Sequence, residues 1–301
     1  MSSRAASIHS RLLALAQTRG DEFEGVLTRF ATERFLYRLS QAPGRDALWL
    51  KGALLFDLWF DVRHRPTRDA DFLGFGPPDA ARLEASLREA CAVQVDDGMA
   101  YDAASIRIAE IREEARYGGM RAKLLGHLGK ARSTLQLDVG YGDAVTPGPE
   151  DVSYPTLLDD LPAPRLRAYP RETVVAEKLE AIVSLGMTNS RMKDYFDLRA
   201  LAAEGAVNPR TLAAAIAATF ARRGTPLPPE LPLGLSVEFA EDHTKLTQWQ
   251  AFLRKNRLEA PALAEVVREV REFIAAPLQA AREGSLQARS PSPSPSSRTS
   301  P

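Results

Sequence analysis

The chain has 301 residues, with 39 basic and 39 acidic side chains, so its formal net charge is zero. Hydrophobic residues make up 45% of the sequence and charged residues 26%, which is typical of a globular protein and excludes a disordered or collagen-like chain. The neutral balance gives no general argument for nucleic-acid binding, so that function would have to depend on local charge. A single cysteine, Cys91, excludes a disulfide framework and a cysteine-rich zinc site.

Membrane and export signals are not expected. No apolar run approaches the roughly 20 residues that cross a bilayer. The apolar patch near the N-terminus, Leu12 to Ala16, is shorter than the roughly 7 to 15 residues of a signal-peptide core. We therefore expect a cytoplasmic protein.

The first half of the chain begins with helices and continues with strands. Apolar residues recur at helical spacing over residues 6–18 and 21–40. A short apolar run at 48–50 predicts a strand that enters a turn at Gly52, and residues 53–60 resemble a helix.

Further strands are predicted after this helix. Residues 71–75 form the next one, followed by a helix over 79–91. Strand patterns dominate residues 92–143. Within them Leu135, Leu137 and Val139 alternate with polar residues, which places Asp138 on the face opposite the leucines.

Helical periodicity returns after residue 170. The predicted helices cover residues 171–185, 191–203, 209–221, 245–257 and 262–282. Strands that cluster in one block predict an α+β fold with a small mixed sheet and a helical C-terminal region, not a doubly wound array. The expected divisions are N-terminal helices packing on the core (1–45), a sheet domain (46–165), a helical domain (166–284) and a disordered, Ser- and Pro-rich tail (285–301).

Two carboxylates in the first half indicate a metal site. Asp69 and Asp71 are two residues apart on a predicted strand, so their side chains point to the same side and can bind a hard cation through oxygen. Upstream, the Gly52 turn opens a helix and offers backbone N–H groups to phosphate oxygens. A third carboxylate on another strand, for which Asp138 is the best candidate, would complete a two-metal site of the kind that supports displacement at phosphorus.

Four stretches together resemble the AbiEii-type nucleotidyltransferase toxins, a family with the DNA polymerase β-like nucleotidyltransferase fold. The stretch 65–71 resembles their R-x-T-x-D-x-D motif, and Leu137-Asp138-Val139 resembles the second motif. Residues 169–181 resemble the third motif, and residues 191–198 the fourth, R-x-K-D-x-x-D-L. The four matches follow the family's order. One departure is Ala53 after Gly52, where the family usually has a second glycine or a serine.

The resemblance implies a role for each matched residue. It implies catalytic roles for Asp69, Asp71, Asp138, Lys178 and Asp194, with the first three as ligands of two Mg²⁺ ions. It implies contacts to a nucleoside triphosphate from Lys51, Gly52, Ala53, Arg65, Thr67, Lys178, Arg191 and Lys193. Without the resemblance, Lys178 would be interpreted as a solvated lysine, and Asp194 and Asp197 as surface charges of a helix.

A basic stretch next to Asp138 is the candidate RNA-binding region. No acidic residue lies between Glu114 and Asp138, and this interval carries Arg116, Arg121, Lys123, Lys130 and Arg132. Such a run can follow a phosphate backbone, although it can also be a solvated edge of a sheet.

The leading functional hypothesis is a magnesium-dependent nucleotidyltransferase toxin of a toxin–antitoxin pair. By resemblance, it transfers nucleotides from a nucleoside triphosphate to RNA, with the tRNA 3′ end as the favoured acceptor, which blocks translation. A cognate antitoxin is the expected partner. The alternatives are the same chemistry on a protein hydroxyl or a small molecule such as an antibiotic, or a catalytically degenerate binding module.

Overall fold

The computed structural model describes residues 3–61, 64–67, 69–111 and 118–289. The chain divides into two compact units. The first, here the sheet unit, contains Met1–Asp143 and Gly148–Pro170; the second, the helical unit, contains Ala144–Pro147 and Arg171–Pro301. The expected α+β class, with a mixed sheet followed by helices, is confirmed.

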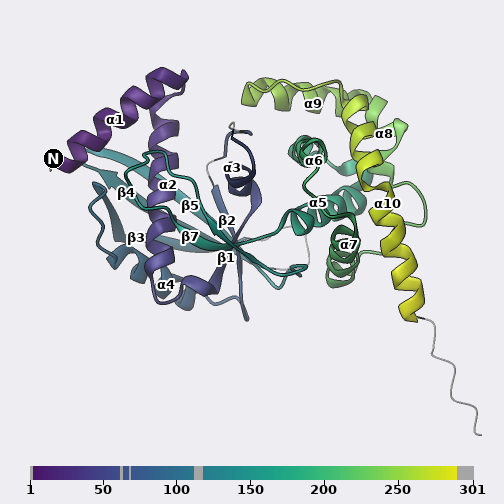
Figure 1. Ribbon diagram of the computed structural model, residues 1–301, viewed down its shortest axis with the longest axis horizontal. Coiled ribbons are helices and arrows are strands. Elements are labelled where there is room, and N and C mark those ends of the chain that lie inside the picture. Colours follow the sequence, from purple (N-terminus) through teal and green to yellow (C-terminus); the bar gives the residue numbers. More distant parts are fainter. Residues whose placement is uncertain (1–2, 62–63, 68, 112–117, 290–301) are drawn as a thin grey trace, which may run out of the picture. The chain divides into compact units, whose positions relative to one another are not determined.

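One mixed sheet organises the described part of the sheet unit, with the strand order β3-β4-β5-β2-β1-β7-β6 (Figure 1). Its strands are β1 (Leu48–Lys51), β2 (Asp69–Gly74), β3 (Met99–Ile111), β4 (Gly119–Leu128), β5 (Ala131–Tyr141), β6 (Glu150–Ser153) and β7 (Arg165–Ala168). Neighbours pair antiparallel except β2 with β5 and β1 with β7, which are parallel. The sequence pattern did not predict β6 and β7, because these four-residue strands lack the apolar run that marks β1.

One face of the sheet is covered by helices. Leu50, Phe72, Leu137 and Val139 are buried there, and α2 (Phe23–Gln41) packs on this face against β5 and β7 (Figure 1). The helix α4 (Ala80–Ala92) packs on β3, and α1 (Ser3–Arg19) packs on α2. The leucines of β5 are thus buried and Asp138 points to the other face, as the alternation predicted.

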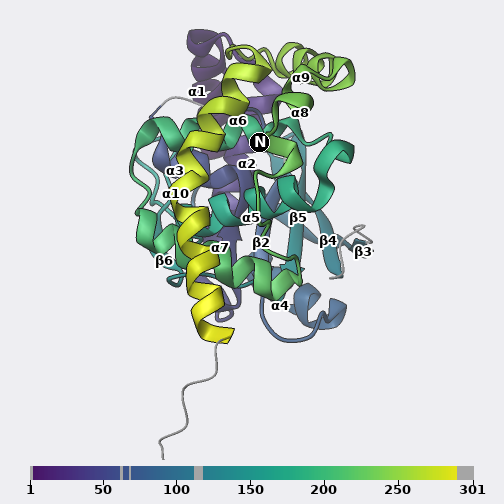
Figure 2. The same cartoon turned by 90° about the vertical axis from the view of Figure 1, so that its right-hand side faces the viewer.

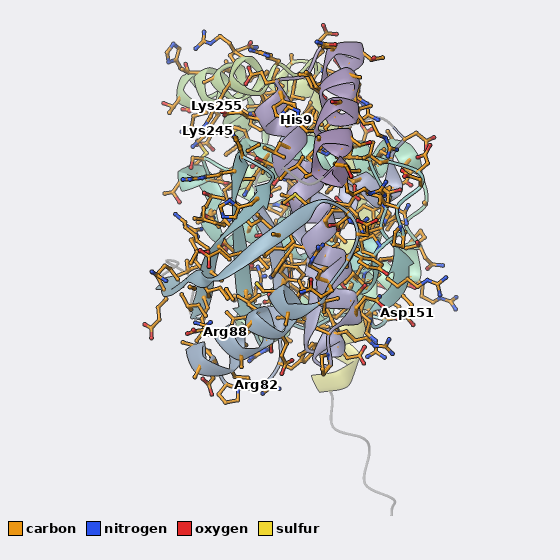
Figure 3. All side chains as sticks on the ribbon, turned by 90° about the vertical axis from the view of Figure 1, so that its left-hand side faces the viewer. His9, Arg82, Arg88, Asp151, Lys245 and Lys255 are labelled. Atoms are coloured by element: carbon orange, nitrogen blue, oxygen red, sulfur yellow. The ribbon has the colours of Figure 1, made fainter. Side chains whose placement is uncertain are left out.

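The covering helices extend over the length of the sheet unit. Figure 3 shows Arg82 and Arg88 of α4 at one end of this unit and His9 of α1 at the other. The helix α4 begins after Asp79, whose carboxylate accepts hydrogen bonds from the backbone N–H groups of Ala81 and Arg82, at 2.9 and 3.1 Å.

A buried ionic cluster ties α2 to the loops around it. Asp97 is fully buried and accepts hydrogen bonds from Arg34 at 3.1 Å and from Arg38 at 2.7 and 2.9 Å. The same guanidinium groups donate to the carbonyl oxygens of Pro162 and Met99. Charges of both signs in one hydrogen-bonded network explain how α2 can bury two arginines.

The helical unit contains α5 (Arg171–Leu185), α6 (Met192–Glu204), α7 (Pro209–Arg223), α8 (Val237–Glu241), α9 (His243–Asn256) and α10 (Leu263–Arg289). Short 3₁₀ turns lie at Gly186–Thr188 and Leu233–Leu235. Figure 2 shows α10 running along α6 and α7, which it contacts. The Asn208 side chain caps α7, and the left-handed Gly224 ends it. In the described part of the chain, no helix is long and apolar enough to cross a membrane.

Two expected segments differ from the structure. Residues 53–60 are not one helix but a 3₁₀ turn (Gly52–Leu55, η2) followed by the single turn α3 (Phe56–Trp59). The disordered tail expected from residue 285 was wrong for residues 285–289, which continue α10, because leucine, glutamine, alanine and arginine all favour a helix. Residues 290–301 lie outside the described residues.

Candidate functional site

The register of the sheet brings three predicted carboxylates to one face. Asp71 of β2 lies opposite Asp138 of β5, and Asp69 lies opposite Gln136. Residues opposite each other in a ladder point to the same side of the sheet. The three carboxylates therefore project from the face that α2 leaves uncovered, where Asp69, Asp71 and Asp138 are all partly exposed.

Two cations continue this row across the sheet. Lys51 of β1 lies opposite Asp71, and Arg121 of β4 lies opposite Asp138. The row across β1, β2, β5 and β4 thus reads lysine, aspartate, aspartate, arginine. We call the face that carries this row and Asp69 the carboxylate face.

Gly52 makes room for Asp71. Its φ is +75°, a backbone conformation that L side chains rarely adopt. A Cβ atom on Gly52 would lie 2.8 Å from both Cβ and Cγ of Asp71, well inside the ordinary contact distance. The turn that the sequence predicted as a phosphate cradle therefore also seats the carboxylate group of Asp71.

Arg121 holds Asp138 through both carboxylate oxygens. Its Nε donates to Oδ1 at 2.8 Å and its Nη2 to Oδ2 at 2.6 Å. The hydrogen bond to Asp138 raises the pKa of Arg121 above its usual value, and the negative charges of Asp69 and Asp71 add to the shift. Arg121, predicted as an RNA-binding residue, thus lies against the carboxylates themselves.

Lys51 is held at the other end of the row. Its Nζ donates to Oδ2 of Asp143 at 2.8 Å, and both side chains are largely buried. Gly140 of β5 lies next to this ammonium group, since a Cβ there would be 3.4 Å from Nζ. Asp143 was assigned no role from the sequence, since it follows the strand without a recognisable motif.

A second cluster of predicted residues lies in the helical unit. Lys178 of α5 donates from Nζ to Asp194 at 2.9 Å and to Asp197 at 2.7 Å, and Arg191 donates to Asp194 at 2.7 Å. The side chains of Asp194 and Asp197 have no exposed area, so their interpretation as surface charges of a helix is wrong. Lys178 is only 12% exposed, which also excludes a solvated lysine.

Charge balance keeps Asp194 ionised. Burial alone would raise the pKa of Asp194, but the charges and hydrogen bonds of Lys178 and Arg191 outweigh it, so the pKa lies below its usual value. Asp197 is the second aspartate of the R-x-K-D-x-x-D-L pattern, and its i, i+3 spacing from Asp194 was the signal that could have assigned it to this cluster. Lys193, predicted to contact the nucleotide, lies on the exposed side of α6.

Three predicted RNA-binding residues share the carboxylate face. Lys123 lies two residues after Arg121 on β4 and opposite Gln136, and Arg132 lies opposite His127. Both are exposed. Lys130 lies in the turn between β4 and β5, and Arg116 lies outside the described residues.

A cavity of about 460 Å³ opens beside the start of β2. Thr67, a predicted nucleotide-binding residue, lines it together with Asp57, Phe60 and Tyr154, and Thr67 also donates to the carbonyl oxygen of Asp69 at 3.3 Å. The cavity is therefore adjacent to the strand that carries Asp69 and Asp71. Arg65, another predicted nucleotide-binding residue, lies in the same described segment, 64–67.

The donor chemistry of this face fits a hard divalent cation. Asp69 and Asp71 offer carboxylate oxygens on one strand, and the space at Gly52 keeps Asp71 in place. Across the residues that the structure describes, however, no three side chains of His, Cys, Asp or Glu form a group that could hold a metal ion. Asp69 and Asp71 are therefore the residues that could bind a metal ion, whereas Asp138 is hydrogen-bonded to Arg121.

Comparison with known proteins decides the family. Residues 34–276 match the family described as nucleotidyl transferase AbiEii toxin, Type IV TA system. The chain belongs to the AbiEii family. It is therefore a nucleotidyltransferase of a toxin–antitoxin family, and the four motif resemblances that predicted this family are confirmed at the level of the family.

One solved structure supports the fold of this AbiEii protein, and a second is reported beside it. A candidate nucleotidyltransferase from Helicobacter pylori is similar over 87% of this chain and 98% of its own, with a TM-score of 0.50 and 17% identity. JHP933 from Helicobacter pylori covers 96% of this chain and 97% of its own, with a TM-score of 0.47 and 17% identity. No curated protein matches the chain significantly.

Proposed function

We propose that this AbiEii protein transfers nucleotides from a nucleoside triphosphate to RNA in the cytoplasm, with Mg²⁺ as cofactor and the tRNA 3′ end as the favoured acceptor. The observation that carries the proposal is the register that places Asp69 and Asp71 on one sheet face, with the Gly52 turn beneath Asp71. A transferase that stabilises a developing phosphate charge needs such a preorganised set of oxygen ligands.

The chain's own residues divide the work of binding. Asp69 and Asp71 would hold the magnesium ion, which would supply positive charge to the phosphates of the bound triphosphate. Lys51 and the Gly52–Ala53 turn contact the phosphates, together with Arg65 and Thr67. Asp138 is the third carboxylate of this face.

Basic side chains on the carboxylate face support an RNA acceptor. Lys123 and Arg132 are exposed there, and Lys130 follows in the next turn. A basic surface beside the reacting group attracts a phosphate backbone and makes binding depend on salt. This arrangement favours a nucleic acid over a small neutral acceptor.

The roles proposed for residues of the helical unit are those that the family resemblance implies. Lys178 is proposed to contact the triphosphate, with Arg191 and Lys193 as further phosphate contacts and Asp194 as the residue that organises Lys178 and Arg191. The ion pairs among Lys178, Asp194 and Arg191 support this grouping, since they hold each cation in a defined position.

A transfer assay tests the proposal. Purified chain, Mg²⁺, each of the four labelled nucleoside triphosphates in turn, and total RNA should give labelled RNA concentrated in the tRNA fraction. Asp69→Asn should abolish the label, because it removes one of the two metal-binding carboxylates. Asp151→Asn is the matched control, since Asp151 lies on β6 with its side chain 89% exposed and should transfer normally (Figure 3).

The labelled fraction separates the remaining acceptors. Label in protein, or in a small molecule added as acceptor, with none in RNA would refute the RNA acceptor while leaving nucleotidyl transfer intact. A catalytically degenerate module predicts no transfer at all. It also predicts no rise in melting temperature with Mg²⁺ and triphosphate, whereas the transferase should show a rise that Asp71→Asn removes.

The cognate antitoxin is the proposed cellular partner. The family name associates these proteins with type IV toxin–antitoxin systems. Expression of the chain should therefore arrest growth, and co-expression of the antitoxin should restore it. The Asp69→Asn chain, produced at the same level, should leave growth unaffected.

A further inference from the structure

Asp138, expected from the sequence to bind a second metal ion, is paired with Arg121 instead. Asp138 lies directly opposite Asp71, and both of its oxygens accept hydrogen bonds from Arg121, at 2.8 and 2.6 Å. The Asp138 side chain is 18% exposed and that of Arg121 is 41% exposed. The pair thus lies within the carboxylate face, at its boundary with solvent.

Arg121 places a permanent positive charge against Asp138. Its guanidinium does not lose its proton, and its planar fork matches the two oxygens of Asp138. A divalent cation on Asp138 would therefore lie beside a permanent positive charge. Repulsion between the two cations opposes metal binding at this carboxylate.

The surroundings of Asp138 strengthen the pair. Gln136, two residues earlier on β5 and on the same face, has its Nε2 atom 3.5 Å from Oδ2 of Asp138. Arg121 lies opposite Asp138 in the ladder, so backbone pairing of β4 with β5 fixes the guanidinium at the level of the carboxylate. The contact thus follows from the register of two central strands.

We propose that Arg121 serves as the fixed second cation of this site: one divalent metal ion is held by Asp69 and Asp71, and Asp138 stays bound to Arg121. Arg121 is then a positioning residue for Asp138. This inference rests on the proposed function, and it replaces the expectation that Asp138 is a ligand of a second magnesium ion. In the described part of the chain, no three carboxylates lie together in one metal-binding group. This agrees with a site in which Asp69 and Asp71 bind the metal ion and Asp138 does not.

Metal binding without nucleotide provides the first test. Mn²⁺ is titrated into the full chain and free Mn²⁺ is followed by its electron paramagnetic resonance signal. The Asp71→Asn chain supplies the baseline for weak surface binding. We expect one Mn²⁺ ion per wild-type chain above this baseline. Two ions, or none, would overturn the inference.

A paired substitution provides the second test. The Arg121→Gln, Asp138→Asn double variant removes both charges together, so the net charge near Asp69 and Asp71 stays the same. If Asp138 binds no metal, the Mn²⁺ affinity should stay within about threefold of wild type. If Asp138 is a ligand, the affinity should fall by about tenfold or more, as it should in Asp71→Asn.

The outcomes divide cleanly. A loss greater than about threefold in the folded double variant overturns the inference, and a smaller one supports it. If the double variant does not fold, the stoichiometry of the wild type decides alone. Nucleotide transfer is measured separately on the wild-type chain, so a failure of the one-metal assignment is distinct from a failure of the proposed function.

Discussion

Replacing Gly52 by alanine should disturb both the stability of the sheet unit and the position of Asp71. Two costs add at this position. A non-glycine residue in the left-handed region costs about 1 to 2 kcal/mol, and Gly52 has φ +75°. The new Cβ would also lie 2.8 Å from Cβ and Cγ of Asp71, and overpacking of this kind costs about 1 to 3 kcal/mol.

The sum predicts that Gly52→Ala lowers the free energy of unfolding by about 2 to 5 kcal/mol. Gly20→Ala is the matched control. Gly20 has φ +67° in the same unit, but a Cβ there meets nothing within 4 Å, so only the backbone strain applies. Urea denaturation of the two variants and the wild type separates the steric cost from the strain.

The steric overlap in Gly52→Ala should also lower the rate of nucleotide transfer. Asp71 has to move to relieve the overlap, and a displacement of about 1 Å at a reacting group can lower a rate by about 100-fold. Gly20→Ala should transfer nucleotides at the wild-type rate. If Gly52→Ala destabilised the protein no more than Gly20→Ala, Asp71 would not be seated on this turn, and the reasoning would be refuted.

Three further predictions concern buried charges. Asp97→Ala should lower the unfolding free energy by about 3 to 5 kcal/mol in urea denaturation, because the buried guanidinium of Arg38 loses Asp97 and that of Arg34 keeps only Glu33; a loss below about 1 kcal/mol would contradict this. Lys178→Met should cost about 3 kcal/mol, because two fully buried aspartates lose their shared cation, and an unchanged urea midpoint would contradict it. Burial raises the pKa of Glu33 to about 7 from an ordinary value of 4.5. The free energy of unfolding of the wild type therefore falls as the pH rises from about 4.5 to about 7, because Glu33 must then ionise while buried. The unfolding free energy of Glu33→Gln relative to wild type should therefore shift in favour of the variant by up to about 3 kcal/mol between pH 5 and pH 8.5, and a shift of the opposite sign would count against it.

Local patterns were sufficient for most elements and for the family. The alternation of Leu135, Leu137 and Val139 predicted the buried face of β5, because a strand turns successive side chains to opposite sides. Helical spacing predicted α1, α2, α4, α5, α6, α7, α9 and α10 for the same kind of local reason. The short elements β6, β7 and α8 were missed, because a few residues contain too little periodicity.

Partners of charged side chains could not be predicted in the same way. Arg121 and Asp138 are 17 residues apart, and only the pairing of β4 with β5 sets them opposite each other. Asp97 lies 63 residues from Arg34, and their contact depends on how a loop returns to α2. A sequence shows that a charge is present but not which charge it will face after folding.

The sequence by itself determined the family and the α+β class, and it supplied the candidate site residues, because motif spacing and side-chain periodicity are local properties of the chain. The tertiary structure decided which of these residues meet. It placed Asp69, Asp71 and Asp138 on one sheet face and fitted Asp71 into the space at Gly52. It also paired Arg121 with Asp138. These contacts depend on strand register, which is set by pairing between distant segments of the chain. Motif spacing alone does not determine that register.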